Sequence, residues 1–157
     1  MEFASKERFE EAERIEKVRN KMIKYILYKK RTEQEVRMKF EDEDQEIVED
    51  AIEYFKEQKY IDDNDYIVRS MNEFKAIKHL SIKEVVYKLT SKGVNKKILD
   101  EYICQNKENM LEYEISSAKA IILKKRGSQE DKTIRDYLFR KGYMSETVNI
   151  AFDDLDE

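Results

Sequence analysis

The sequence predicts an all-α protein, and three features of its composition indicate this class. The 157 residues include no proline and only three glycines, whereas the many turns of a β-sheet protein usually require both residue types. Charged residues make up 42% of the chain, yet hydrophobic residues still make up 40% and the net charge is only −4. This balance disfavours intrinsic disorder, because enough apolar surface remains to form a core. Most of the chain is therefore expected to form helices joined by short turns.

The N-terminal part of the chain has the periodicity of one long helix. Its apolar residues recur at steps of three and four, which places them on a single helix face. They are Phe9, Ala12, Ile15, Val18, Met22, Tyr25 and Ile26. We expect residues 1–16 to form an N-terminal helical extension and residues 17–62 to form a first three-helix repeat.

Two capping signals start the other helices of this repeat. Thr32 and Glu35 have the spacing of a capping box, in which the hydroxyl accepts a backbone N–H bond and the carboxylate reaches back to the cap. The acidic run 41–44 is expected to cap the third helix, because carboxylates are favoured at the positive end of the helix dipole. The corner before this helix lacks a glycine, so we expect it to be tighter or less regular than the later corners.

The pattern recurs with a period of about 49 residues. Ser81 and Glu84 form a second capping box 49 positions after the first, and Gly142 follows Gly93 by the same interval. Glycine is favoured at both places because a helix often ends in a left-handed residue. Asn95 is expected to cap the helix that follows Gly93.

The third copy is less regular at its start. Ser128 and Asp131 resemble a capping box, two positions earlier than strict register. We place the second repeat at 63–107 and the third at 108–157. Because units this small bury little surface alone, neighbouring repeats are expected to pack on one another as an elongated, curved array.

Charge is segregated along the sequence. Residues 17–39 hold nine basic and two acidic side chains, and residues 41–65 hold two basic and twelve acidic ones. Residues 75–97 hold seven basic and one acidic, and residues 116–143 hold eight basic and three acidic. The basic windows thus fall at the same place in each repeat, which predicts a repeated positive surface for a partner.

Fourteen basic residues are the candidate partner-binding set. They are Lys29, Lys30, Arg31, Arg37, Lys78, Lys83, Lys88, Lys92, Lys124, Lys125, Arg126, Arg135, Arg140 and Lys141. Several of them end helices, where cations are also favoured by the helix dipole. Solvated helix ends and partner contact therefore both remain open for these residues.

The chemistry-bearing residues are few. A single cysteine, Cys104, excludes an internal disulfide framework and is expected to be a buried or half-buried thiol. A single histidine, His79, is expected at the surface or in a cap. The pair at 62–63 is interpreted as helix capping, and Tyr137 and Tyr143 as core, with stacking on a partner as the alternative. No phosphate loop, dinucleotide turn or nucleophile elbow is present, so we expect no catalytic residue, metal or cofactor.

The cellular setting is inferred from what the sequence lacks. No apolar run approaches the ~20 residues of a membrane span, and the first residues are charged. A cytoplasmic, monomeric protein with no membrane partner is expected.

Three motifs in order resemble the RecX family of RecA regulators. Residues 30–36 read KRTEQEV, residues 59–63 read KYIDD and residues 140–143 read RKGY. The likeness extends from about Lys17 to Phe152. The family motif has a glycine before its tyrosine, where this chain has Lys59. The short N-terminal stretch stands where many relatives carry a longer segment, so truncation and divergence are both open.

The resemblance implies a non-enzymatic regulator acting in homologous recombination, DNA repair and the SOS response. Family members bind the RecA–DNA filament and alter ATP hydrolysis, strand exchange and filament dynamics. Inhibition is the expected direction here, although the residues leave the sign open. A direct DNA-binding helical module and a helical scaffold for another protein are the alternatives. The pI of 5.4 favours a protein partner, with at most weak DNA contact.

Overall fold

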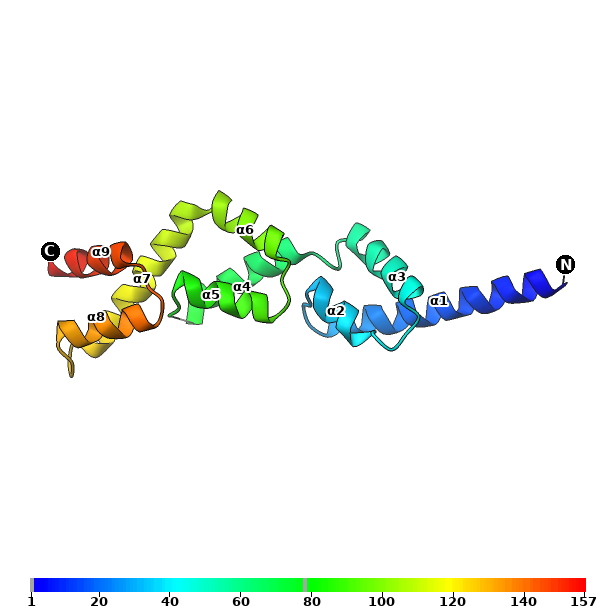
Figure 1. Ribbon diagram of the computed structural model, residues 1–157, viewed down its shortest axis with the longest axis horizontal. Helices are drawn as coiled ribbons and strands as arrows, with labels where there is room; N and C mark the ends of the chain where they lie inside the picture. Colours follow the sequence, from blue (N-terminus) through cyan, green and yellow to red (C-terminus); the bar gives the residue numbers. More distant parts are fainter. Residues whose placement is uncertain (1, 78) are drawn as a thin grey trace. The chain divides into compact units, whose positions relative to one another are not determined.

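A computed structural model describes residues 2–77 and 79–157, and these residues form nine helices and no strand (Figure 1). The helices are α1 (Glu2–Tyr28), α2 (Glu33–Lys39), α3 (Gln45–Glu57), α4 (Asp63–Ile77), α5 (Ile82–Ser91), α6 (Lys96–Gln105), α7 (Lys107–Lys125), α8 (Asp131–Arg140) and α9 (Ser145–Asp156). The all-α prediction is confirmed.

The chain divides into two compact units. The first consists of the chain up to Tyr66 together with the turn Lys92–Asn95, and the second of Ile67–Ser91 together with Lys96–Glu157. The boundaries proposed for three repeats (17–62, 63–107 and 108–157) remain a prediction.

In the first unit, α2 and α3 pack on the C-terminal half of α1 (Figure 1). The core residues come from the predicted stripes of the three helices and from the segment after α3. They are Val18, Met22, Ile26, Val36, Phe40, Ile47, Val48, Ala51, Ile52, Phe55 and Ile61. Each buried aliphatic side chain of this kind contributes about 1.5–3 kcal/mol of hydrophobic free energy.

The N-terminal half of α1 is helical but is not covered by α2 or α3 (Figure 1). Phe9 is 65% exposed, Ala12 is exposed and Ile15 is half-buried. Helical periodicity places these residues on the face of Val18 and Met22, but it does not show where the covering helices end.

The predicted capping signals of the first unit are confirmed. The Thr32 hydroxyl accepts the Glu35 N–H at 3.1 Å, and the Glu35 carboxylate accepts the Thr32 N–H at 3.0 Å. Asp44 caps α3 by accepting the N–H of Glu46 at 3.0 Å. The corner before Asp44 is irregular, as expected.

That corner is held by one side chain. The Gln45 amide donates to the carbonyls of Phe40, Glu41 and Glu43 at 3.2, 3.0 and 2.8 Å. A side-chain amide thus satisfies carbonyls that a glycine-ended helix would satisfy with its own backbone.

The second unit contains a core between α7, α8 and α9. Its buried residues are Ala118, Ile121, Ile122, Ile134, Leu138, Tyr143, Val148, Ala151 and Phe152. The second capping box is confirmed, since the Ser81 hydroxyl accepts the Glu84 N–H and the Glu84 carboxylate accepts the Ser81 N–H, both at 3.1 Å.

The predicted third capping box is wrong. The helix α8 begins at Asp131, and its N-cap is Glu130, whose side chain makes no capping bond. Glu130 lies 49 positions after Ser81. The helix therefore starts in strict register, and the Ser128–Asp131 spacing is coincidental.

The helices α3 and α8 end in a Schellman motif, in which a left-handed residue and the residue after it donate their N–H groups back to the helix. In α8 this residue is Gly142 with φ +94°, and the Tyr143 N–H donates to the Leu138 carbonyl at 3.1 Å. In α3 it is Lys59 with φ 65°, and the Tyr60 N–H donates to the Phe55 carbonyl at 2.9 Å. Lys59 therefore adopts the conformation for which glycine is preferred.

Equivalent hydrogen bonds occur 49 residues apart, one in each unit. In the first, the Thr32 hydroxyl donates to the Lys92 carbonyl at 2.7 Å. In the second, the Ser81 hydroxyl donates to the Lys141 carbonyl at 2.8 Å. This recurrence is what tandem repeats would produce, because equivalent turns would pack on equivalent caps.

A buried carboxylate accompanies each of these bonds. Asp63 accepts the N–H groups of Glu33 and Asn95, both at 2.9 Å. Glu114 accepts the Ile82 N–H at 3.0 Å and the Thr147 hydroxyl. Each carboxylate therefore caps the start of a helix and also holds a second segment.

The structure tests the predicted burial of three single residues. Cys104 is exposed, so the expected burial is wrong; it lies toward the solvated edge of α6, one position after the half-buried Ile103. His79 is exposed, as expected. Tyr143 is only 3% exposed, which confirms its place in the core and removes it as a stacking residue.

Candidate partner-binding surface

Ion pairs neutralise much of the positive charge in the first unit. Lys30 pairs with Asp65 at 2.8 Å, and Lys21 pairs with Glu43 at 3.3 Å. Lys56 pairs with Glu33 at 2.9 Å. The acidic segment 41–65 thus folds back against the basic segment that precedes it, and charges segregated in sequence are mixed in space.

Arg37 is the strongest example of this neutralisation. It donates from Nε and Nη2 to the two Glu49 oxygens at 2.7 and 3.0 Å, and Nη1 donates to Glu33 at 3.3 Å. The hydrogen bonds from Arg37 lower the pKa of Glu49, and the Glu49 carboxylate raises the pKa of Arg37. Arg37 therefore links α2 to α3 and is less available to a partner.

The remaining basic candidates of the first unit differ in how accessible their charges are to a partner. Arg31 stacks over the Tyr25 ring at 3.9 Å and donates to the Tyr25 carbonyl at 3.3 Å. Lys29 and Lys92 are exposed, and neither has an ion-pair partner among the residues the structure describes. These two side chains are the accessible cations of the set here.

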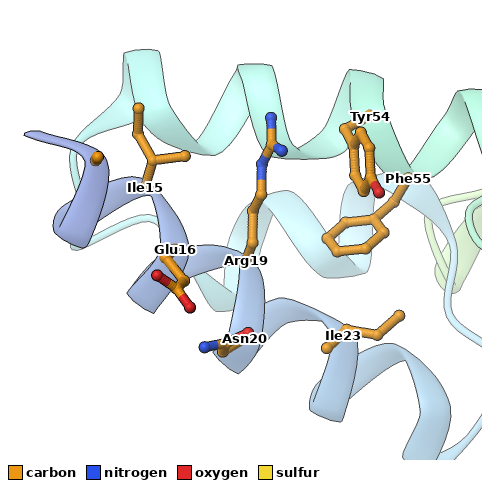
Figure 2. Close-up of a pocket in the computed structure, with 8 residues that line it drawn as sticks. Ile15, Glu16, Arg19, Asn20, Ile23, Tyr54 and Phe55 are labelled. Carbon is orange, nitrogen blue, oxygen red and sulfur yellow. The ribbon is translucent and has the colours of Figure 1, made fainter.

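An open apolar groove runs between α1 and α3 in the same unit (Figure 2). It has a volume of about 470 Å³ and is lined by Ile15, Ile23 and Phe55, among others. Arg19 points across it toward α3 and lies 4.4 Å from the Tyr54 ring centroid (Figure 2). The groove carries no cluster of reactive side chains, so it indicates packing or docking rather than chemistry.

Several candidates of the second unit have structural partners. Arg126 bridges Asp131 at 3.1 Å and Asp156 at 2.9 Å, and the Asp131 carboxylate raises its pKa. Arg135 lies 4.2 Å from the Phe152 ring centroid and donates to Asn149 at 2.9 Å. These two residues tie α7, α8 and α9 together.

Other candidates of this unit are solvated. Lys83, Lys88 and Arg140 are exposed. The Arg140 Nε donates to the Asp136 carbonyl at 3.4 Å. The methylene chain of Lys83 covers Gly142, where an added Cβ would lie 2.9 Å from Lys83 Cδ. Lys78 lies outside the described residues.

Three further candidates come together at one pocket of about 380 Å³. Lys124 and Lys125 at the end of α7, Lys141 after α8, and His79 before α5 all line it, beside Tyr137. The Lys125 and Lys141 ammonium groups lie 4.0 and 5.4 Å from the Tyr137 ring centroid. The sequence indicated the lysines but not their convergence.

The pocket also has members that are not among the fourteen basic candidates. Ser128 and Gln129, in the turn after α7, also line it. Their signal in the sequence is weak: two small polar residues between the 124–126 cluster and a helix start.

Within the described residues, neither a group that could hold a metal ion nor a helix that could cross a membrane is found. In residues 2–77 and 79–157 no group of three or more metal-ligating side chains is close enough to hold an ion. No helix within those ranges is both long and apolar enough to cross a bilayer.

Comparisons with known proteins agree with the class that the fold defines, an all-helical protein with clusters of basic side chains on its surface. No family model matches. "Regulatory protein RecX" of Staphylococcus epidermidis is 28% identical over 142 residues, covering 87% of this chain and 53% of that protein. "Regulatory protein RecX" of Streptococcus pneumoniae is 29% identical over 149 residues, covering 88% of this chain and 55% of that protein. The chain thus spans about half the length of the curated relatives it matches.

Solved structures share the fold. The crystal structure of RecX from Lactobacillus salivarius superimposes with a TM-score of 0.76 at 19% identity, covering 92% of this chain and 98% of that one. A second crystal structure, of regulatory protein RecX, gives a TM-score of 0.75 at 22% identity, covering 90% of this chain and 74% of that one. Together the sequence relatives and the structures support the RecX family, which confirms the resemblance seen in the motifs.

Proposed function

We propose that this chain is a non-enzymatic regulator of RecA that binds the RecA–DNA filament and lowers its ATP hydrolysis, strand exchange and filament growth. The observation that supports this most is the similarity, at 28% identity over 87% of the chain, to a protein named regulatory protein RecX. The described residues contain no group of side chains that could hold a metal ion, which is compatible with that role.

The accessible cations define how such a regulator would bind. In the first unit these are Lys29 and Lys92, and in the second they include Lys83, Lys88 and Lys124. Each exposed charge contributes little alone. Several weak contacts on one chain raise the total affinity, because each later contact forms at a high effective concentration. A polymer of identical protomers offers such repeated contacts.

The acidic residues of the first unit would restrict the orientation of binding. Their side chains repel phosphate and attract basic protein surfaces, so electrostatic complementarity would favour one arrangement on a nucleoprotein partner. A helical scaffold for an unrelated protein remains the alternative, and it predicts no effect on RecA.

A filament titration tests the proposal. Preformed RecA–single-stranded DNA filaments are mixed with increasing amounts of the purified chain, and ATP hydrolysis is followed together with filament length. We expect saturable binding and a falling hydrolysis rate. A rising rate would retain RecA as the partner but refute inhibition, whereas an unchanged rate without binding would refute the proposed function.

A further inference from the structure

The pocket between the ends of α7 and α8 gathers positive charge from three separate segments. Lys124 and Lys125, Lys141, and His79 line the same space of about 380 Å³, and none of the lining residues is acidic. Bringing like charges together is unfavourable unless an anion or solvent screens them. Helix capping and internal ion pairing are the two internal explanations for this convergence.

Backbone N–H groups, rather than lysine side chains, make the capping hydrogen bonds at these two helix ends. In α7, the Arg126 N–H donates to the Ile122 carbonyl at 2.9 Å, and the Gln129 N–H donates to the Lys125 carbonyl at 2.9 Å. In α8, the Schellman motif at Gly142 has the same effect. The lysine ammonium groups remain available for a ligand.

Internal ion pairing does not explain the convergence either. The only carboxylate paired with one of these lysines in the described residues is Glu84, 3.6 Å from the Lys141 Nζ. The other Glu84 oxygen is held by the Ser81 N–H. Lys124 and Lys125 have no carboxylate partner within residues 2–77 and 79–157, so positive charge is in excess at this pocket.

We propose that this pocket binds a backbone phosphate of single-stranded nucleic acid. Lys124, Lys125 and Lys141 neutralise the phosphate, Ser128 and Gln129 donate hydrogen bonds to its oxygens, and Tyr137 contacts the adjacent base. The inference goes beyond the proposed function, because it concerns nucleic acid alone and requires no RecA.

Phosphate fits this arrangement better than the carboxylate of an acidic protein. A tetrahedral phosphate accepts hydrogen bonds from several directions and lysine binds it as a point charge, whereas a planar carboxylate is matched best by the fork of an arginine. The pocket supplies lysines from different directions and no arginine. An aromatic ring beside a basic groove is also the usual platform for a stacked base.

Fluorescence anisotropy with a labelled oligodeoxythymidine of about 20 nucleotides tests this proposal at about 50 mM salt. The variant Lys124→Gln/Lys125→Gln/Lys141→Gln is compared with a matched control, Lys96→Gln/Lys97→Gln/Lys107→Gln, which removes the same charge from exposed lysines away from the pocket. Circular dichroism and thermal unfolding are used to check that both variants are folded.

The pocket variant is expected to bind at least about tenfold more weakly, with the slope of log affinity against log salt reduced by about 2, since each lost phosphate contact on a single strand removes about 0.7. The control is expected to bind nearly as the unaltered chain does. Equal losses in the two variants, or no loss in the pocket variant, would overturn the proposal.

Two further titrations identify the source of the anion. Pocket-dependent binding of polyglutamate without binding of the oligonucleotide would assign the pocket to an acidic protein and overturn the proposal. Binding of inorganic pyrophosphate without the oligonucleotide would assign it to a small free phosphate and overturn it as well. No RecA is present in these assays, so their failure leaves the filament titration as an independent test.

Discussion

At the scale of single residues, the two buried carboxylates Asp63 and Glu114 differ in the groups they satisfy. Asp63 is 6% exposed and accepts two backbone N–H groups, which cannot change their direction. Glu114 is fully buried and accepts one backbone N–H and one threonine hydroxyl. A hydroxyl can rotate and act as an acceptor instead, so the two sites should tolerate an amide differently.

We predict that Asp63→Asn destabilises the fold by about 1–3 kcal/mol, because its NH₂ group would face a backbone donor and leave it unsatisfied. Glu114→Gln should cost less than about 1 kcal/mol, since the Thr147 hydroxyl can turn to accept. Urea unfolding followed by circular dichroism measures both. Asp62→Asn is the control for charge removal, because Asp62 accepts one N–H as an ordinary cap and asparagine caps as well as aspartate. Equal losses at Asp63 and Glu114 would contradict this explanation.

Lys59 carries a local conformational cost. Its φ of 65° lies in the left-handed region, which costs a residue with a Cβ about 1–2 kcal/mol. We predict that Lys59→Gly raises the free energy of unfolding by about 0.5–1 kcal/mol, after the greater entropy of glycine in the unfolded chain is included. Lys24→Gly, at an exposed helical position, should lower it by about 1 kcal/mol. Stability unchanged or reduced in Lys59→Gly would refute the prediction.

Some residue roles could be predicted from the sequence and others could not. The Thr32 and Ser81 boxes could be, because both partners lie within one helical turn. The Ser128 box failed because a three-residue spacing alone does not fix where a helix begins. The hydrogen bond from the Asn95 N–H to the Asp63 carboxylate joins residues 32 positions apart. No local sequence pattern encodes such a contact.

At the scale of elements, pairing between α2 and α3 reverses the charge segregation of the sequence. The helices were predictable from periodicity, but the ion pairs across them were not, because they depend on which faces meet. The Arg37–Glu49 pair is the clearest case, with hydrogen bonds of 2.7 and 3.0 Å. Because the pair is exposed to solvent, its contribution to the free energy of unfolding is that of a surface ion pair, about 0.2–1 kcal/mol.

The pH dependence of this pair has a defined sign. Arg37 lowers the pKa of Glu49 below its usual value of 4.5, so the pair stabilises the fold above that value and the contribution is lost as pH falls through the lowered pKa. We predict that Glu49→Gln costs up to about 1 kcal/mol near pH 7 and progressively less as the pH falls below 4.5. Unfolding in urea across this range measures the difference.

Asp50→Asn serves as the control for the pH series. Asp50 is exposed on the same helix and has no ion-pair partner in the part of the chain described. Its effect should be small at both ends of the range. A cost of Glu49→Gln that is independent of pH would show that the pair does not stabilise the fold.

At the scale of the whole chain, the proposed binding would depend on cations that have no ion-pair partner among the described residues. The sequence identified Arg126 as part of one cluster with Lys124 and Lys125, but only the structure shows that Arg126 bridges two carboxylates. It also shows His79 beside residues about 45–60 positions away. Window counts of charge could predict the cluster, whereas its division into structural and available members required the fold.

We therefore predict that Lys124→Glu/Lys125→Glu weakens filament binding by about tenfold or more without changing the helical circular-dichroism spectrum, because opposite charges replace two attractive ones. Arg126→Glu should instead lower the unfolding temperature, since it places a third carboxylate beside Asp131 and Asp156. Unaltered binding in the double variant would return these lysines to a solvated helix end.

Co-sedimentation with preformed RecA–single-stranded DNA filaments is the most direct measurement of whether this chain regulates RecA through the filament. The unaltered chain should sediment with filaments in a saturable manner, and Lys124→Glu/Lys125→Glu should stay largely in the supernatant. A chain that remains in the supernatant at every filament concentration would contradict the proposed role.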